Sequence, residues 1–176
     1  MPLVNTKKMF EDAYEKGYAV GAFNVDSIAM VQACLLTAEK VRSPIIVSFS
    51  KGSREFVHPG NIKDLIEIVA KDITIPYAIH LDHGKSVQLC KDCIDEGFTS
   101  VMIDASAYDF EENIRQTKEV VEYAHARGAT VEGELGPMSR GDNPRFKKFT
   151  DPELVEGIER IVTSDEYTLG IHDLIV

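Results

Sequence analysis

The chain has 176 residues, of which 44% are hydrophobic, and this length suits a single domain with a full-sized core. Its formal net charge of −10 argues against nucleic acid or an anionic membrane as the main partner, but it still allows a phosphorylated metabolite. No apolar run approaches the roughly 20 residues of a membrane span, and the N-terminal residues lack a signal-peptide pattern. Three cysteines suit a reducing compartment, so we expect a cytoplasmic protein.

Apolar stretches alternate with helical patterns at intervals of roughly 25–30 residues, which is the period of a β/α unit. After a leading helix near 5–16, six strands are expected near 18–24, 44–50, 76–82, 100–105, 129–135 and 167–172. The first intervening helix places Ile28, Val31 and Leu35 on one face after a cap at Asp26 or Ser27. Further helices are expected at 59–71, 86–96, 110–127 and 152–163.

The stretch 137–149 interrupts this alternation with Pro, Gly, Asp and Asn, and we expect a mobile loop there, either a lid or a solvated connection. A closed eight-stranded barrel usually needs about 250 residues. Six strands are expected here, so the spacing leaves two architectures open: an open parallel sheet, or a barrel that lacks its last strands. Either way, we expect one β/α domain over residues 1–176.

Cys90 and Cys93 have C-x-x-C spacing but lie within a helical pattern. No second cysteine pair is present to complete a structural zinc site. We therefore expect both to be buried helix residues without a redox or zinc role.

Polar side chains stand where several expected strands end. The run 79–84, Ile-His-Leu-Asp-His-Gly, brings Asp82 and His83 to the end of the third strand, Asp104 follows the fourth and Glu134 the fifth. The carboxyl ends of parallel strands meet at one rim, so these groups are expected to be neighbours. Asp82 is suited to proton transfer and His83 to binding zinc, although a lone Asp-His pair more often forms only a hydrogen-bonded strand terminus.

Two further carboxylates support a metal at this rim. Glu132 and Glu134 are two apart on one strand and so share a face, which is costly unless they are paired, hydrated or bound to a cation. Glu134, together with His83 and Asp104, suits zinc with a harder cation beside it. His172, after the sixth strand, is a further candidate ligand, and His80 is either a core or a supporting residue.

These residues carry a family resemblance. The chain resembles the class II, zinc-dependent fructose-1,6-bisphosphate aldolases in segments that follow one another at family spacing. The matching segments are 18–25 (YAVGAFNV), 81–84 (LDHG), 97–106 (GFTSVMIDAS), 110–113 (FEEN), 120–128 (VVEYAHARG) and 132–136 (EGELG).

The resemblance implies a (β/α)8 TIM barrel and reversible cleavage of a ketose bisphosphate to dihydroxyacetone phosphate and glyceraldehyde 3-phosphate, a reaction of glycolysis and gluconeogenesis. It makes Asp82 the group that moves the proton of the hydroxyl beside the scissile carbon, and His83 a ligand of the zinc that polarises the ketone. Asp104 and Glu134 match positions near the metal or an alternative metal position, and a second divalent or monovalent cation is also allowed. Asn24 and Ser50 match substrate contacts. We also expect a homo-oligomer.

Four departures from the family pattern stand out. The loop that carries a proton-transfer glutamate in the family has Asp142 as its only acid here, and Ala107 replaces a histidine. The sixth strand reads LGIHD where the family has Gly-Thr-x-His-Gly, so that His172 would substitute for the second zinc histidine. We expect strands seven and eight to lie beyond this sequence, and we therefore expect little aldolase activity from this chain alone. Two alternatives therefore remain: an aldolase for a related sugar phosphate of the tagatose bisphosphate type, and an inactive relative that binds a metal or a partner.

Overall fold

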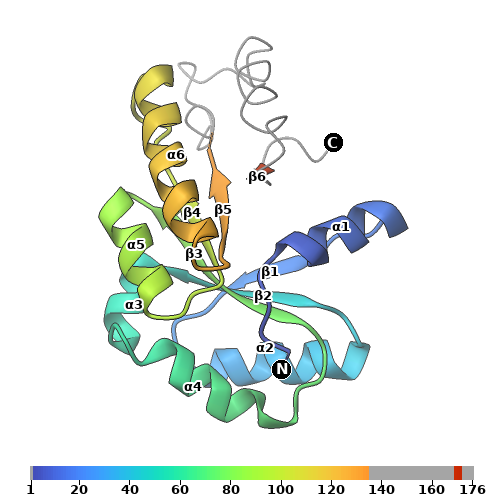
Figure 1. The fold of residues 1–176 in the computed structure, drawn as a ribbon. Helices are drawn as coiled ribbons and strands as arrows, with labels where there is room; N and C mark the ends of the chain where they lie inside the picture. Colours follow the sequence, from blue (N-terminus) through green and yellow to red (C-terminus); the bar gives the residue numbers. More distant parts are fainter. Residues whose placement is uncertain (1, 135–168, 172–176) are drawn as a thin grey trace, which may run out of the picture.

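A computed structural model of the chain describes residues 2–134 and 169–171 (Figure 1). Six parallel strands form a single sheet in which the spatial order follows the order along the chain. The strands are β1 (Gly21–Asn24), β2 (Ile45–Ser50), β3 (Tyr77–Gly84), β4 (Ser100–Ile103), β5 (Thr130–Gly133) and β6 (Leu169–Ile171). Parallel neighbours in unbroken chain order, with helices in the described connections from β1 to β5, are the winding of a TIM-type barrel, so the expected β/α alternation and fold class are confirmed.

The helices also follow the expected sequence, with one addition. They are α1 (Lys7–Lys16), α2 (Ile28–Val41), α3 (Lys51–Val57), α4 (Ile62–Val69), the short 3-10 turn η1 (Ala70–Asp72), α5 (Val87–Asp95) and α6 (Phe110–His125). Ser27 caps α2 by accepting a hydrogen bond from the Met30 amide at 3.4 Å. The unexpected helix is α3, which starts directly after β2. The expected helix at 152–163 and the loop at 137–149 lie outside the described residues.

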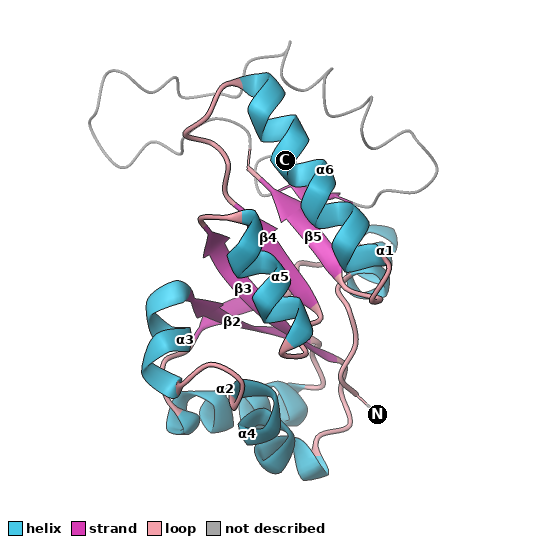
Figure 2. Ribbon diagram, turned by 60° about the vertical axis from the view of Figure 1, so that its left-hand side comes forward, coloured by secondary structure: helices cyan, strands magenta, loops and turns pink. Residues whose placement is uncertain are grey.

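The outer face of the sheet packs against α2, α4, α5 and α6 (Figure 2). Alternate strand residues point to this face, because side chains alternate along a strand. They form one apolar cluster with the helices and are almost completely buried; examples are Val47, Phe49, Ile79, Leu81, Val101 and Ile103. Each such side chain contributes roughly 1.5–3 kcal/mol of burial free energy, so this layer holds the domain together.

Helix α1 lies on the other side of the sheet, apart from the remaining helices (Figure 1). Met9 of α1 packs with Ile46 and Ala78, which are inner-face residues of β2 and β3. Thr6 is anchored to β5, where its hydroxyl oxygen lies 2.7 Å from that of Thr130. The apolar part of the inner face is therefore closed by α1 at the amino ends of the strands, and the polar residues lie toward their carboxyl ends.

Cys90 and Cys93 are both fully buried on α5, as the sequence predicted. Burial raises the pKa of each thiol to about 12, so both stay protonated at neutral pH. Within residues 2–134 and 169–171, every helix is too short or too polar to span a lipid bilayer.

Candidate metal and proton-transfer site

The carboxyl end of β3 departs from regular strand geometry, and this departure builds the site. Asp82 is still in register with Ser50 of β2, but the pairing of β3 with β4 shifts between Leu81 and Gly84. His83 adopts a left-handed backbone conformation, with φ of 51°. Successive side chains of a regular strand point to opposite faces, whereas a bulge re-aims them. As a result Asp82 and His83 lie on the same side, with Asp82 Oδ1 4.0 Å from His83 Nε2.

Gly84 lets β3 and β4 approach closely behind this bulge. A Cβ atom at Gly84 would lie 2.5 Å from the backbone oxygen of Met102 and 2.8 Å from Cys90 Sγ. The Asp104 amide donates a hydrogen bond to the Gly84 oxygen at 2.9 Å. The glycine therefore fixes the position of His83 relative to Asp104.

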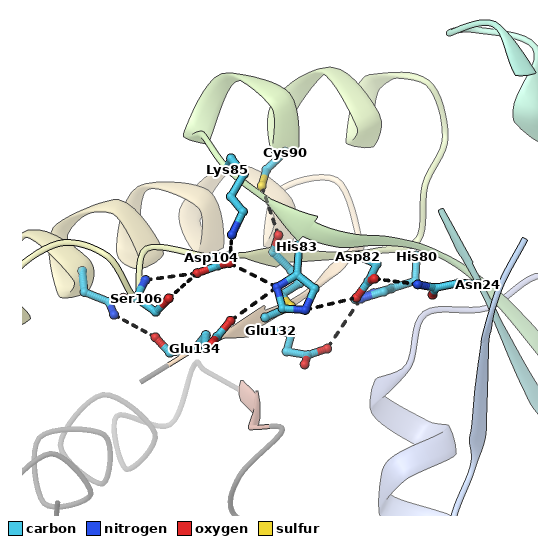
Figure 3. A network of polar contacts seen from close by, with 12 residues as sticks. Asn24, His80, Asp82, His83, Lys85, Cys90, Asp104, Ser106, Glu132 and Glu134 are labelled. Carbon is cyan, nitrogen blue, oxygen red and sulfur yellow. Dashed lines mark hydrogen bonds and ion pairs between the residues drawn. The ribbon is translucent and has the colours of Figure 1, made fainter. Parts of the chain in front are cut away.

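Three side chains from three neighbouring strand ends converge in front of the bulge (Figure 3). His83 Nδ1 lies 3.1 Å from Asp104 Oδ2 and 3.4 Å from Glu134 Oε2. One ligand atom from each residue falls within 4.8 Å of the other two. The Asp104 and Glu134 side chains are only 4% and 5% exposed, whereas His83 is 36% exposed and faces the accessible side.

This donor set fits a divalent metal ion. One imidazole nitrogen and two carboxylate oxygens suit zinc, and the two hard oxygens also suit a second, harder cation. A cation would compensate for the burial of two carboxylates, whose cost is several kcal/mol when they are not neutralised. Cys90 and Cys93 are not part of this group, the one candidate metal group found within the described residues.

Asp104 is held ionised, as a metal ligand must be. Burial by itself raises the pKa of Asp104, but hydrogen bonds from Lys85, Ser106 and His83 outweigh burial and hold the pKa well below its usual range. Ser106 donates to Asp104 Oδ1 twice, from its hydroxyl at 2.6 Å and from its amide at 3.2 Å. The carboxylate is therefore both charged and fixed in orientation at neutral pH.

Asp82 receives its support from β1. The side-chain amide of Asn24 donates a hydrogen bond to Asp82 Oδ2 at 2.8 Å. This leaves Asp82 Oδ1 on the side of His83. Ser50 lies between these strands, but its hydroxyl caps α3 by accepting from the Ser53 amide at 3.1 Å. The substrate contacts expected for Asn24 and Ser50 stay predictions.

A second polar layer lies alongside the site. His80 Nδ1 is 2.8 Å from the Ser100 hydroxyl, and His80 Nε2 is 3.5 Å from Glu132 Oε2. Asn113 of α6 donates to the backbone oxygen of Glu134 at 2.8 Å. Thus the two glutamates contact different histidines, and only Glu134 belongs to the candidate metal group.

Sequence reasoning missed three of the supporting residues. Ser106 could have been found, because a serine two residues after an aspartate often donates to its carboxylate. Lys85 and Asn113 gave no such signal, since a long side chain and a helix residue can point in several directions. His172 and Asp142 lie outside the described residues.

Sequence comparison shows which known proteins this chain is similar to. The sequence profile described as fructose-bisphosphate aldolase class-II matches residues 4–165. The fructose-bisphosphate aldolase of Geobacillus stearothermophilus is 50% identical over 141 residues, which cover 77% of this chain and 48% of that protein. That of Staphylococcus aureus strain Mu50 is also 50% identical over 141 residues, covering 78% and 49%. The chain thus spans about half the length of the curated relatives that it matches.

Solved structures agree with the sequence relatives. The YdjI aldolase from Escherichia coli K12 superposes with a TM-score of 0.77 at 34% identity, covering 90% of this chain and 57% of that one. The fructose-bisphosphate aldolase from Campylobacter jejuni superposes with a TM-score of 0.77 at 26% identity, covering 95% and 57%. Both likenesses extend over nearly the whole chain.

Proposed function

The chain belongs to the class II fructose-bisphosphate aldolase family, and we propose that it contributes the proton-transfer group and part of the metal site for aldol cleavage of a phosphorylated ketose. The observation that carries the proposal is the end of β3. There Asp82 stands beside His83, and His83 faces the buried carboxylates of Asp104 and Glu134. An aldol cleavage needs a base for a hydroxyl proton and a positive centre for the developing charge, and this rim offers residues for both.

Asp82 is proposed to take the proton of the hydroxyl beside the carbon–carbon bond that breaks. A carboxylate can act as a base only if it is held within reach of that proton and is not fully occupied by other donors. The Asn24 amide satisfies Oδ2 at 2.8 Å and so orients the group, while Oδ1 stays on the side of His83. In the reverse direction the same carboxyl group returns the proton.

His83, Asp104 and Glu134 are proposed to hold zinc, or zinc and a second divalent or monovalent cation in neighbouring positions. When bound, zinc supplies Lewis-acid stabilisation of negative charge on the ketone oxygen. Asp104 enters this role already ionised, because Ser106 and Lys85 stabilise its charged form. His172 is proposed as an additional ligand on the basis of its place after β6.

The proposed substrate is fructose 1,6-bisphosphate, with dihydroxyacetone phosphate and glyceraldehyde 3-phosphate as products. A related sugar phosphate of the tagatose bisphosphate type is the alternative. We place the protein in the cytoplasm and in glycolysis and gluconeogenesis. We also propose a homo-oligomer.

A coupled retro-aldol assay with fructose 1,6-bisphosphate, with and without a chelator, tests the reaction in a chain that also includes strands seven and eight. Cleavage that chelator abolishes and zinc restores is the expected result. Cleavage that survives complete metal removal would contradict the proposed chemistry. Intact zinc binding without cleavage of either ketose bisphosphate would favour an inactive metal-binding relative.

A calorimetric zinc titration tests the ligand assignment separately. His83→Asn should weaken zinc binding by more than about 100-fold, because losing a ligand costs more than losing a residue that only supports one. Asparagine is chosen because it tolerates the left-handed backbone of His83. His58→Asn is the matched control, since His58 is exposed and has φ of 82°. Unchanged zinc affinity in His83→Asn would remove His83 from the site.

A further inference from the structure

Lys85 contacts Asp104, one of the proposed metal ligands. Its ammonium group contacts Asp104 Oδ2, the same oxygen that faces His83 Nδ1 at 3.1 Å (Figure 3). The backbone of Lys85 is fixed between Gly84, which ends β3, and Ser86, which caps α5 by accepting from the Leu89 amide at 3.2 Å. The lysine therefore stays beside the candidate metal group wherever its side chain points.

The two partners of this ion pair differ sharply in exposure. The Lys85 side chain is 66% exposed, whereas that of Asp104 is 4% exposed. Asp104 is held from its other oxygen, because Ser106 donates twice to Oδ1. Thus the carboxylate is fixed, and the ammonium is the partner that can leave for solvent with little loss of packing.

We propose that Lys85 is an internal cation that occupies Asp104 Oδ2 in the metal-free protein and must be displaced when a metal ion binds there. The proposal rests on the metal site proposed above. Two buried carboxylates, Asp104 and Glu134, lie around one imidazole, and a positive charge among them lowers the cost of burying them. Lys85 supplies that charge from a flexible four-carbon stem.

A metal ion and the ammonium cannot share this oxygen. Two cations on one carboxylate oxygen would lie within a few ångströms of each other and repel in a partly buried site. Occupation by Lys85 and occupation by metal therefore exclude one another. Lys85 is expected to stabilise the metal-free protein and, for the same reason, to weaken its affinity for metal.

Lys85→Gln is the test, with Lys85→Arg and Lys91→Gln as controls. Glutamine removes the positive charge and arginine keeps it. Lys91 lies on α5 and pairs with Glu119 of α6, so its substitution removes one paired ammonium outside the candidate metal group. Zinc affinity is measured by calorimetric titration, and thermal unfolding is measured with and without zinc, both on the whole chain.

Lys85→Gln should bind zinc roughly three- to tenfold more tightly than the unsubstituted protein, while both controls stay within about twofold of it. Without metal, Lys85→Gln should melt about 2–4 °C lower, and saturating zinc should close or reverse that gap. If Lys85 had a purely structural role, Lys85→Gln would lower the melting temperature by the same amount with and without metal.

Equal or weaker zinc binding by Lys85→Gln, in a protein whose His83→Asn variant loses zinc, would overturn this role of Lys85 and leave the metal site standing. If neither Lys85→Gln nor His83→Asn changes zinc affinity, both the role of Lys85 and the assignment of His83 as a ligand are overturned.

Discussion

The two faces of β3 carry opposite kinds of side chain. On the outer face, Ile79 and Leu81 are completely buried against the helices. On the inner face, His80 contacts Ser100 and Glu132, and Asp82 accepts a hydrogen bond from Asn24. A single strand thus supplies core and candidate site through nothing more than the alternation of its side chains.

This contrast separates stability from chemistry. The outer face gains free energy from apolar burial, whereas the inner face spends some on desolvating polar groups that then hold one another in place. The separation ends at the bulge, where a Cβ atom at Gly84 would meet β4, α5 and Leu81 at once. Substitutions on the two faces should therefore affect different measurements, and a substitution at Gly84 should affect both.

Asp82→Asn should have the largest effect, and this effect should be on the reaction rate and not on stability. The amide keeps the shape and can still accept the bond from Asn24, but it cannot take a proton. In a chain that also includes strands seven and eight, we expect kcat for aldol cleavage to fall by roughly 10²–10⁴-fold, with the free energy of unfolding nearly unchanged. Steady-state kinetics and urea denaturation measure the two quantities. Retention of most of the turnover at neutral pH would exclude Asp82 as the acid–base group.

Leu81→Ala should show the reverse pattern. Leu81 is 0% exposed within the outer cluster, so truncation removes buried apolar area and leaves a cavity. We expect a loss of about 2–5 kcal/mol of unfolding free energy, with zinc affinity of the folded protein unchanged. Urea denaturation and calorimetry check this, and Ile79→Val, at about 0.5–1.5 kcal/mol, is a milder control on the same face. A large drop in zinc affinity would show that the faces are not independent.

Much of this arrangement could be predicted from the sequence. Apolar periodicity located the strands and most helices, and Asp26 or Ser27 was expected to cap α2; the structure shows that Ser27 does. The rule that parallel strands end at one rim predicted that His83, Asp104 and Glu134 would be neighbours, and the structure brings these three together. The fold class also followed from the family segments.

The rest depended on three-dimensional detail that sequence patterns do not encode. Helix α3 has only seven residues and begins directly after β2, so no helical period can be recognised. The bulge that brings Asp82 and His83 to one side is a property of the β3–β4 register. Glu132 and Glu134 are equivalent by alternation, and only the strand register shows that Glu132 contacts His80 and Glu134 contacts His83.

Gly84→Ala should affect both stability, which depends on the outer face of β3, and zinc binding, which depends on the inner face. Its new methyl group would lie 2.5 Å from the Met102 oxygen and 2.8 Å from Cys90 Sγ, so the strand end and α5 must shift. We expect a loss of about 1–3 kcal/mol of stability together with weaker zinc binding. Gly52→Ala is the matched control, since its Cβ would be 3.9 Å from the nearest atom. Intact stability and zinc affinity in Gly84→Ala would refute the role given to this close approach.

The smallest effect concerns the thiols of the outer layer. Burial raises the pKa of Cys90 and Cys93 to about 12, so the folded protein holds these protons more tightly than the unfolded chain does. The stability that they contribute is fully present below the unfolded-chain pKa of about 8.5–9 and is lost as pH rises toward 12. Between pH 9 and 10 we expect a loss of about 1 kcal/mol per thiol. Urea denaturation at pH 7 to 10 should show this fall, and a Cys90→Ala, Cys93→Ala double variant should show a flatter one.

The half-buried Cys34 should react with a thiol reagent in the folded protein, whereas Cys90 and Cys93 should react only as the protein unfolds. Rapid modification of all three thiols at neutral pH would show that the outer layer opens independently of the site.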